Sequence, residues 1–246
     1  MRAIILAAGI GKRLGENHSG PKSLLRFGDR SLLARHIEAL RGLNIDHIAV
    51  CVGHEAELLR GEVQTIGAHA VTTTLLNPDF REGSVVSLWT MRRYLDSGGD
   101  VLVMDADVLC DPGLLARLVK SRHANCFLLD RDFEAGEEPV KLCIRGPHIV
   151  EFRKQLAADL RYDFAGESVG FFRFSEGMAV RLARRCQAYV DTGRRNEPYE
   201  EAIRDLIMET PADFGFEDIT GLPWVEIDFP EDMQRAHREI LPRLPA

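Results

Sequence analysis

Hydrophobic residues follow two different spacings in the first half of the chain. Short, largely apolar runs occupy residues 3–6, 47–52, 68–76 and 101–104. Apolar residues recur at helical spacing after Ser31 and over 84–95, and helices are also expected from His54 and after Asp111-Pro112. Strands that are apolar throughout are buried on both faces. This half therefore predicts a parallel sheet with helices on both sides.

The pattern changes near Asn125. Strand-like segments then follow one another with little helix between them, at 125–130, 139–144, 148–154 and 168–174. Helical spacing returns at 175–191 and 198–209, and the chain ends with an expected strand over 223–228 and a helix from Pro230. The pattern predicts one α/β domain over residues 1–246, in which a β-rich insertion adds antiparallel strands to a parallel core.

Composition narrows the class of protein. Hydrophobic residues make up 45% and charged residues 28% of the chain, as in ordinary globular proteins. The net charge of −7 argues against a nucleic-acid partner, and no apolar run approaches the ~20 residues of a membrane helix. The five cysteines form no C-x-x-C pair, which indicates buried thiols in a reducing compartment, so we expect a cytoplasmic location.

Glycines and cations follow the first strand. Gly9 and Gly11 leave the backbone N–H groups accessible to a phosphate chain, and Lys12, Arg13 and Lys22 would offset its charge. A glycine pair after a strand also occurs in simple tight turns. The spacing differs from the dinucleotide-binding G-x-G-x-x-G motif, and no G-K-[ST] follows as in a P-loop. Residues 1–41 hold eight Lys or Arg and three Asp or Glu, an excess of +5 that suits an anionic ligand but also arises by chance.

Paired carboxylates end two other expected strands. Asp105 and Asp107 follow the run at 101–104, and Glu226 and Asp228 end the strand near the C-terminus. Alternate residues share a face, and two buried acids are costly without a cation, so Mg²⁺ is a suitable ligand. Asp228 could instead favour the N-terminus of the helix that follows, and the two roles can coexist. The eight histidines are scattered without the spacing of a zinc site.

The segment Leu6-Ala7-Ala8-Gly9, with Gly11, Arg13 and then Pro21-Lys22, resembles the signature of nucleotidyltransferases that make sugar nucleotides and CDP-alcohols. The resemblance implies a Rossmann-like three-layer α/β fold with a mixed, mostly parallel sheet. It assigns nucleotide binding to residues 1–124, and acceptor binding and completion of the metal site to 125–246. The nucleotide-binding residues that we expect are Leu6, Ala7, Ala8, Gly9, Gly11, Lys12, Arg13, Asn77, Ser84 and Asp105.

The same resemblance implies a metal and several charge contacts. In the family, the glycine loop holds the triphosphate, and the lysine aligned with Lys22 neutralises charge on the reacting phosphates. The aspartate aligned with Asp107 is a metal ligand, which Asp105 more often supports, and the last carboxylate of the E-I-D element joins the metal. We therefore expect Mg²⁺ as cofactor, held by Asp107, Asp228 and Glu226.

The likeness is closest to the CTP-using branch, which includes phosphocholine, aminoethylphosphonate and inositol-1-phosphate cytidylyltransferases. Asn77-Pro78 with residues 83–88 resembles its loop and helix near the base. Lys141 resembles a lysine that contacts the acceptor's phosphate, although a lysine on an alternating strand can equally face solvent. The catalytic residues that we expect are Arg13, Lys22 and Lys141. Five acids within residues 130–138 could attract an ammonium group or form a solvated loop.

We therefore expect an enzyme that transfers CMP from CTP, or from another NTP, to a small phosphorylated alcohol or phosphonate and releases pyrophosphate. Neither nucleic acid nor a membrane is an expected partner, and a homodimer is compatible with the sequence. The alternatives are a sugar-1-phosphate nucleotidyltransferase that uses another NTP, a nicotinamide- or flavin-dependent enzyme, and a nucleotide-sensing module without turnover.

Overall fold

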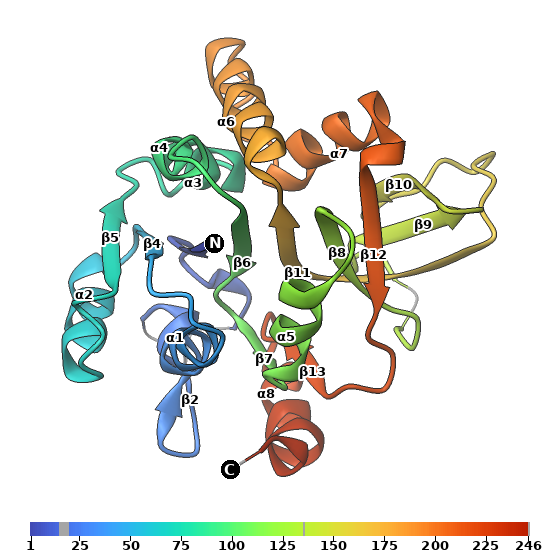
Figure 1. Ribbon diagram of the computed structural model, residues 1–246. Helices are drawn as coiled ribbons and strands as arrows, with labels where there is room; N and C mark the ends of the chain where they lie inside the picture. Colours follow the sequence, from blue (N-terminus) through green and yellow to red (C-terminus); the bar gives the residue numbers. More distant parts are fainter. Residues whose placement is uncertain (15–19, 135, 246) are drawn as a thin grey trace.

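The structure is a computed structural model that describes residues 1–14, 20–134 and 136–245. Its centre is a nine-stranded mixed sheet whose main path runs in the order β10-β9-β11-β6-β1-β4-β5, while β8 and β12 extend it beside β11. Helices lie on both sides of the sheet (Figure 1). The arrangement confirms the expected Rossmann-like α/β class.

Four parallel strands form the half of the sheet built by the first part of the chain. They are β1 (Arg2–Ala7), β4 (Ile48–Val52), β5 (Thr72–Leu76) and β6 (Val101–Asp105). Strand β1 lies between β4 and β6 and pairs with both in parallel, so that the carboxyl ends of β1 and β6 lie side by side. Ligands bind at such strand ends in open α/β sheets.

Five further strands come from the second part of the chain. They are β8 (Asn125–Asp130), β9 (Lys141–Arg145), β10 (His148–Arg153), β11 (Phe164–Phe174) and β12 (Phe214–Asp218). The long strand β11 pairs antiparallel with β6, β8 and β9, and therefore joins the two parts of the sheet. The predicted antiparallel additions are confirmed.

Each face of the sheet is covered by its own set of helices. The set on one face is α3 (Ser84–Thr90), α4 (Arg92–Leu95), α6 (Glu176–Asp191) and α7 (Tyr199–Glu209). The other face carries α1 (Leu32–Gly42), α2 (Ala56–Thr65) and α5 (Gly113–Lys120). Along β1, Ile4 is buried in the first core, whereas Ala3 and Ile5 are buried in the second. This alternation of side chains explains why the strand is apolar throughout.

A small antiparallel pair lies below the main sheet and supports the candidate site. It joins β7 (Val108–Cys110) to β13 (Trp224–Glu226), with Glu226 opposite Val108. The N–H of Ile227 donates to the carbonyl of Asp107 at 2.9 Å. These bonds bring the two pairs of carboxylates expected from the sequence to one place.

The remaining elements are short. They are the 3₁₀ turns Lys12–Leu14, Lys22–Leu24, Pro211–Asp213 and Leu241–Arg243, the hairpin β2 (Arg26–Phe27) and β3 (Arg30–Ser31), the helix α8 (Pro230–Arg235) and the π-helical turn Ala236–Ile240. A separate apolar cluster packs the C-terminal helical segment against the hairpin region, through Phe27, Leu32, Val225 and Ile240. Within the part of the chain that the structure describes, every helix falls short of the length and apolar character needed to cross a bilayer.

Several sequence predictions of element boundaries were wrong. The helix expected over 84–95 is divided at Met91, and the strand expected over 68–76 begins only at Thr72. The sequence pattern also missed β12 and the β2–β3 hairpin. Strand β12 contains Gly215, where a Cβ atom would lie 2.2 Å from Nδ1 of His123. That strand therefore depends on a close tertiary contact, which the local pattern does not reveal.

Candidate active site

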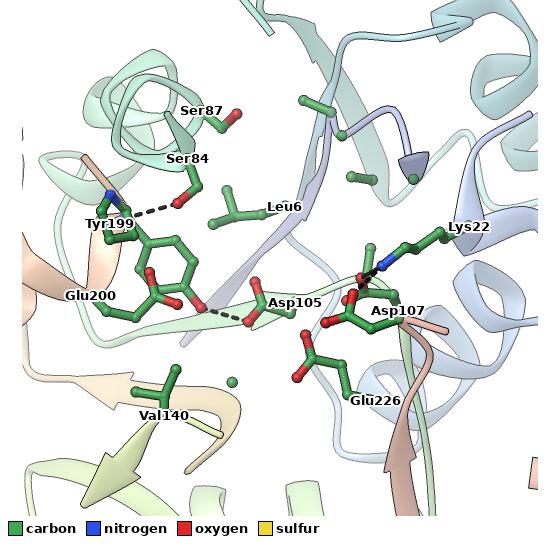
Figure 2. A pocket seen from close by; sticks show the side chains of 18 of the residues that line it. Leu6, Lys22, Ser84, Ser87, Asp105, Asp107, Val140, Tyr199, Glu200 and Glu226 are labelled. Carbon is green, nitrogen blue, oxygen red and sulfur yellow. Dashed lines mark hydrogen bonds and ion pairs between the residues drawn. The ribbon is translucent and has the colours of Figure 1, made fainter. Parts of the chain in front are cut away.

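A cavity of about 450 Å³ opens at the carboxyl ends of β1 and β6. It extends from the glycine loop after β1 to the start of α7, and its lining includes side chains from β11 and β13 (Figure 2). Most residues expected from the sequence line it: Leu6, Ala7, Ala8, Gly9, Gly11, Arg13, Lys22, Ser84, Asp105, Asp107, Glu226 and Asp228. The chain thus brings its separate motifs into one cavity.

The glycine loop packs directly on Lys22. Gly11 has a φ of +70°, a conformation that favours glycine, and a Cβ atom there would lie 3.0 Å from Cγ of Lys22. A Cβ on Gly9 would meet no described atom within 4 Å, so the backbone of Gly9 is accessible from the cavity. The contact with Lys22 and the positive φ explain the glycine at position 11, and access to the backbone explains the glycine at position 9. The side chain of Lys12 lies outside the described part of the structure.

Two cations neutralise the acids at this end of the cavity. Nζ of Lys22 lies 3.0 Å from Asp107 and also forms an ion pair with Asp228, and Arg13 binds the other oxygen of Asp228 at 2.8 Å. The Lys22 and Asp228 side chains are each only 12% exposed. Burial alone would lower the pKa of Lys22, but Asp107 and Asp228 outweigh it, and the pKa is raised. Lys22 is therefore a fixed positive charge.

Three carboxylates gather around that charge. Asp107, Glu226 and Asp228 each offer an oxygen, and the three oxygens lie within 4.8 Å of one another. Burial, followed by the charges of Asp107 and Asp228, raises the pKa of Glu226 well above its usual range. A divalent cation that takes oxygen ligands would relieve this repulsion, so the donor set fits such an ion.

The carboxylate that accepts backbone hydrogen bonds next to α8 is that of Asp232, not that of Asp228. The backbone N–H groups of Asp228 and Phe229 donate to the carboxylate of Asp232, at 2.9 and 2.7 Å. Asp232 therefore satisfies the backbone N–H groups at the start of α8. The carboxylate of Asp228 points instead at Lys22 and Arg13.

Asp105 lies in a different environment from Asp107, although only one residue separates them. Its carboxylate accepts a hydrogen bond of 2.5 Å from the hydroxyl of Tyr199 (Figure 2). Gly170 of β11 lies close by, and a Cβ on it would come within 2.3 Å of the Asp105 carboxylate. Burial raises the pKa of Asp105 well above its usual value, with further increases from Asp107 and Glu200.

The end of the cavity beyond Asp105 is formed by residues that sequence reasoning missed. Tyr199 and Glu200 begin α7, and Lys154 follows β10. The hydroxyl of Ser84 accepts a hydrogen bond of 2.9 Å from the N–H of Tyr199, which fixes the start of α7 against α3. A tyrosine and a glutamate in the first turn of a helix carry no local signal of a binding site. Their place in the cavity follows from packing alone.

Two expected site residues lie outside the cavity lining. Asn77 is 1% exposed and donates to the hydroxyl of Ser87 at 3.1 Å, and Ser87 itself lines the cavity. Nζ of Lys141 donates to the carbonyls of Gly136 and Lys154, at 2.6 and 2.7 Å. Both side chains thus support neighbouring segments.

The acidic segment between Asp130 and Glu138 contributes one side chain to the site. The carboxylate of Glu138 lies 2.7 Å from Arg13 and 3.0 Å from Lys154, and it lines the cavity. All three side chains are about half exposed, at 45%, 55% and 44% for Arg13, Glu138 and Lys154. Glu138 therefore bridges cations from the two halves of the chain at the cavity mouth.

The family of the chain follows from a comparison with protein-family models. Residues 3–169 match the MobA-like NTP transferase domain. The chain belongs to this family. The nucleotidyltransferase resemblance seen in the glycine loop is thereby confirmed, and the transferase domain includes the glycine loop, Lys22 and Asp107.

Characterised relatives share the transfer of a cytidylyl group in their names. The chain is 28% identical to the CMP-5'-(3-aminopropyl)phosphonate synthase of Streptomyces rubellomurinus, over 96% of this chain but only 38% of that protein. It is 22% identical to the CTP:phosphoglutamine cytidylyltransferase of Campylobacter jejuni, over 95% of this chain and 98% of that protein.

The fold also has a solved counterpart. The inositol-1-phosphate CTP transferase of T. maritima superposes with a TM-score of 0.77 at 17% identity, over 98% of this chain and 95% of that chain. At this identity the likeness shows the fold alone. The expected closeness to cytidylyltransferases is confirmed by the two relatives, and the solved structure confirms the fold.

Proposed function

We propose that the transferase moves CMP from CTP to the phosphate or phosphonate of a small acceptor. The observation that carries the proposal is the convergence of the glycine loop, Lys22 and three carboxylates in one cavity. The names of the two relatives support CTP as the nucleotide.

The reaction needs no protein nucleophile. An oxygen of the acceptor's phosphate attacks the α-phosphorus of CTP, the bond from that phosphorus to the bridging oxygen breaks, and pyrophosphate leaves with the bond's electron pair. Catalysis then consists of positioning and charge neutralisation. The open backbone at Gly9, together with Arg13, would bind the phosphate chain, and Lys22 would offset charge near the reacting phosphorus.

Mg²⁺ is the cofactor that we propose, held by Asp107, Glu226 and Asp228. When bound, it would supply positive charge that offsets the charge of the phosphates and of the leaving pyrophosphate. Lys22 now pairs with Asp107 and Asp228, and Arg13 pairs with Asp228, and both are cations that can turn to phosphate oxygens. In the proposed complex with CTP, the acids would therefore pair with Mg²⁺ and the two cations with phosphate oxygens.

The cation that holds the acceptor's phosphate is Lys154 in this proposal. Lys154 lines the cavity, whereas Nζ of Lys141 is taken up by backbone carbonyls. Among the residues that the structure describes, Nζ of Lys154 pairs only with the exposed carboxylate of Glu138. Lys141 then keeps an indirect role, because its bond to the carbonyl of Lys154 positions that segment.

A pyrophosphate-release assay tests this function. The purified protein is mixed with CTP, UTP, GTP or dTTP and with phosphocholine, 2-aminoethylphosphonate, inositol 1-phosphate or glucose 1-phosphate, with and without Mg²⁺. We expect release that requires both Mg²⁺ and an acceptor, with CTP as the best nucleotide. Turnover with hexose phosphates and another NTP would favour a sugar-nucleotide enzyme, and tight binding without release would favour a sensor.

We propose that residues 1–124 form the nucleotide half and 125–246 the acceptor half of one domain. This division is consistent with the origins of the cavity lining, because the loop and Lys22 come from the first half and Tyr199, Glu200 and Lys154 from the second. The homodimer, the cytoplasmic location and the lack of a nucleic-acid partner stay predictions from the sequence.

A further inference from the structure

Glu200 presents an unpartnered oxygen at the acceptor end of the cavity. Its Oε2 is buried and has no hydrogen-bond partner among the residues that the structure describes. The side chain lies beside the Tyr199 ring and on the same side of the cavity as Asp105 (Figure 2). A buried carboxylate oxygen without a donor is unfavourable in a folded protein, which indicates that a ligand supplies the donor.

The electrostatic surroundings of Glu200 favour a cation. Burial raises the pKa of Glu200, and a hydrogen bond with its own backbone and the charge of Lys154 offset this increase only in part. Asp105 adds a second carboxylate on this side, and its only described donor is the hydroxyl of Tyr199. A positive group between Glu200 and Asp105 would relieve both carboxylates.

We propose that Glu200, together with Asp105, binds a primary ammonium group of the acceptor. The inference rests on the proposed function and names the class of substrate: a short phosphate or phosphonate with an amine at its other end. The orphaned oxygen requires a donor, and a primary ammonium offers three N–H groups with a full charge. A quaternary ammonium has no N–H, and the hydroxyls of a polyol carry no charge.

The walls of this end of the cavity suit such a group. Phe152, Phe172 and Val140 line the cavity near Glu200 and Tyr199, so that water is partly excluded. Charge-assisted hydrogen bonds are stronger in these surroundings than in water. Discrimination by a buried hydrogen-bonding group is strong, because an analogue without the donor leaves the carboxylate unsatisfied.

Matched acceptors test the inference in the full-length protein with CTP and Mg²⁺. In 2-aminoethylphosphonate the amine takes the place of the terminal methyl group of propylphosphonate. We expect kcat/KM to be at least about 30-fold higher for the amine, the scale of one hydrogen bond to a charged group. We expect Glu200→Gln to reduce that ratio at least about tenfold. Glu57→Gln, on the exposed surface of α2, is the control.

Two results would overturn the inference. One is a wild-type protein that uses phosphocholine or inositol 1-phosphate as well as 2-aminoethylphosphonate. The other is a folded Glu200→Gln variant that keeps the full preference for the amine. Calorimetric binding of the two phosphonates separates this inference from the proposed function. Amine-selective binding that Glu200→Gln removes supports the inference even without turnover, and equal binding of both phosphonates contradicts it.

Discussion

The two ends of the cavity both carry buried acids, but among the described residues Asp107 and Asp228 form ion pairs at one end, whereas Asp105 and Glu200 form none at the other. Asp107 and Asp228 contact Lys22, and Arg13 also binds Asp228. At the other end, Asp105 has a tyrosine hydroxyl, and one oxygen of Glu200 has no partner in the described structure. The carboxylates at the two ends therefore differ in whether a cation of the protein already pairs with them. In the proposed function, the first set would exchange its cations when nucleotide and metal bind, and the second set would receive a cation from the acceptor.

Paired and unpaired carboxylates also affect the stability of the fold in opposite directions. Removing one partner of a partly buried ion pair destabilises the fold, because it leaves an uncompensated charge. A buried carboxylate without a partner destabilises the fold until a ligand arrives. Binding residues of this second kind weaken the free protein, a common feature of functional sites.

The largest expected effect is on turnover at the metal end. Lys22→Ala and Asp107→Ala should each lower kcat at least about a hundredfold, because each removes a preorganised charge contact. Steady-state pyrophosphate release measures the loss. Lys120→Ala and Asp96→Ala, which change exposed residues elsewhere, are the matched controls. Turnover near the wild-type value in either site variant would remove that residue from the mechanism.

The next largest effect distinguishes the two lysines of the acceptor half. Lys154→Ala should raise the KM for the acceptor about tenfold or more, since it removes a charged hydrogen bond to phosphate. Lys141→Ala should change the same KM less than about threefold, because in the described part of the chain Nζ of Lys141 donates to backbone carbonyls alone. The KM for CTP provides the internal control. A larger effect of Lys141→Ala would restore Lys141 as the phosphate ligand and contradict the proposed role of Lys154.

Stability should change in opposite directions at the two ends. Without metal, Asp228→Asn should lower the Tm, because Lys22 and Arg13 lose a charged partner. Glu200→Gln should raise the Tm by about 2–4 °C, the shift expected for about 1 kcal/mol in a chain of this length. Thermal unfolding of the two variants beside the wild type measures both. A fall in Tm for folded Glu200→Gln would show that this carboxylate has a stabilising partner.

The gain from Glu200→Gln should depend on pH. Because burial raises the pKa of Glu200 above its ordinary value of 4.5, the folded protein holds that proton to higher pH than the unfolded chain. The contribution of Glu200 to stability is then full below the unfolded pKa and is lost as pH rises through the folded pKa. The Tm difference should be largest near pH 8 and should disappear as the pH approaches 4.5. A difference that is constant with pH would point to packing instead of charge.

The smallest expected effect is at the cavity mouth. Glu138→Gln frees Arg13 and Lys154 for phosphate oxygens and should lower the KM for CTP or acceptor less than about threefold, since exposed ion pairs contribute little. The effect should shrink further in high salt. Glu137→Gln, the exposed neighbour, is the control. A tenfold or larger change would mean that Glu138 controls access to the cavity more strongly than its exposure suggests.

Local sequence was sufficient for the nucleotide and metal end. Residues at the ends of neighbouring strands converge once the sheet forms, so the glycine loop, Asp105 and Asp107 could be placed at one edge from the pattern alone. The order of elements and the change to antiparallel strands near Asn125 were predicted for the same reason, because apolar runs report burial on both faces. The hairpin after Lys22 and strand β12 escaped prediction, since both are short and β12 depends on the contact of Gly215 with His123.

Only the tertiary structure decided the acceptor end and the direction of individual side chains. Tyr199 and Asp105 are 94 positions apart in sequence, and their hydrogen bond depends on how α7 packs beside β11 and β6. The sequence offered only Lys141 as the ligand of the acceptor's phosphate, whereas the fold directs Lys141 to backbone carbonyls and places Lys154 in the cavity lining. A strand or helix pattern predicts which face a residue occupies. It does not predict the partners of a charged side chain, because those partners come from segments that are distant in the sequence.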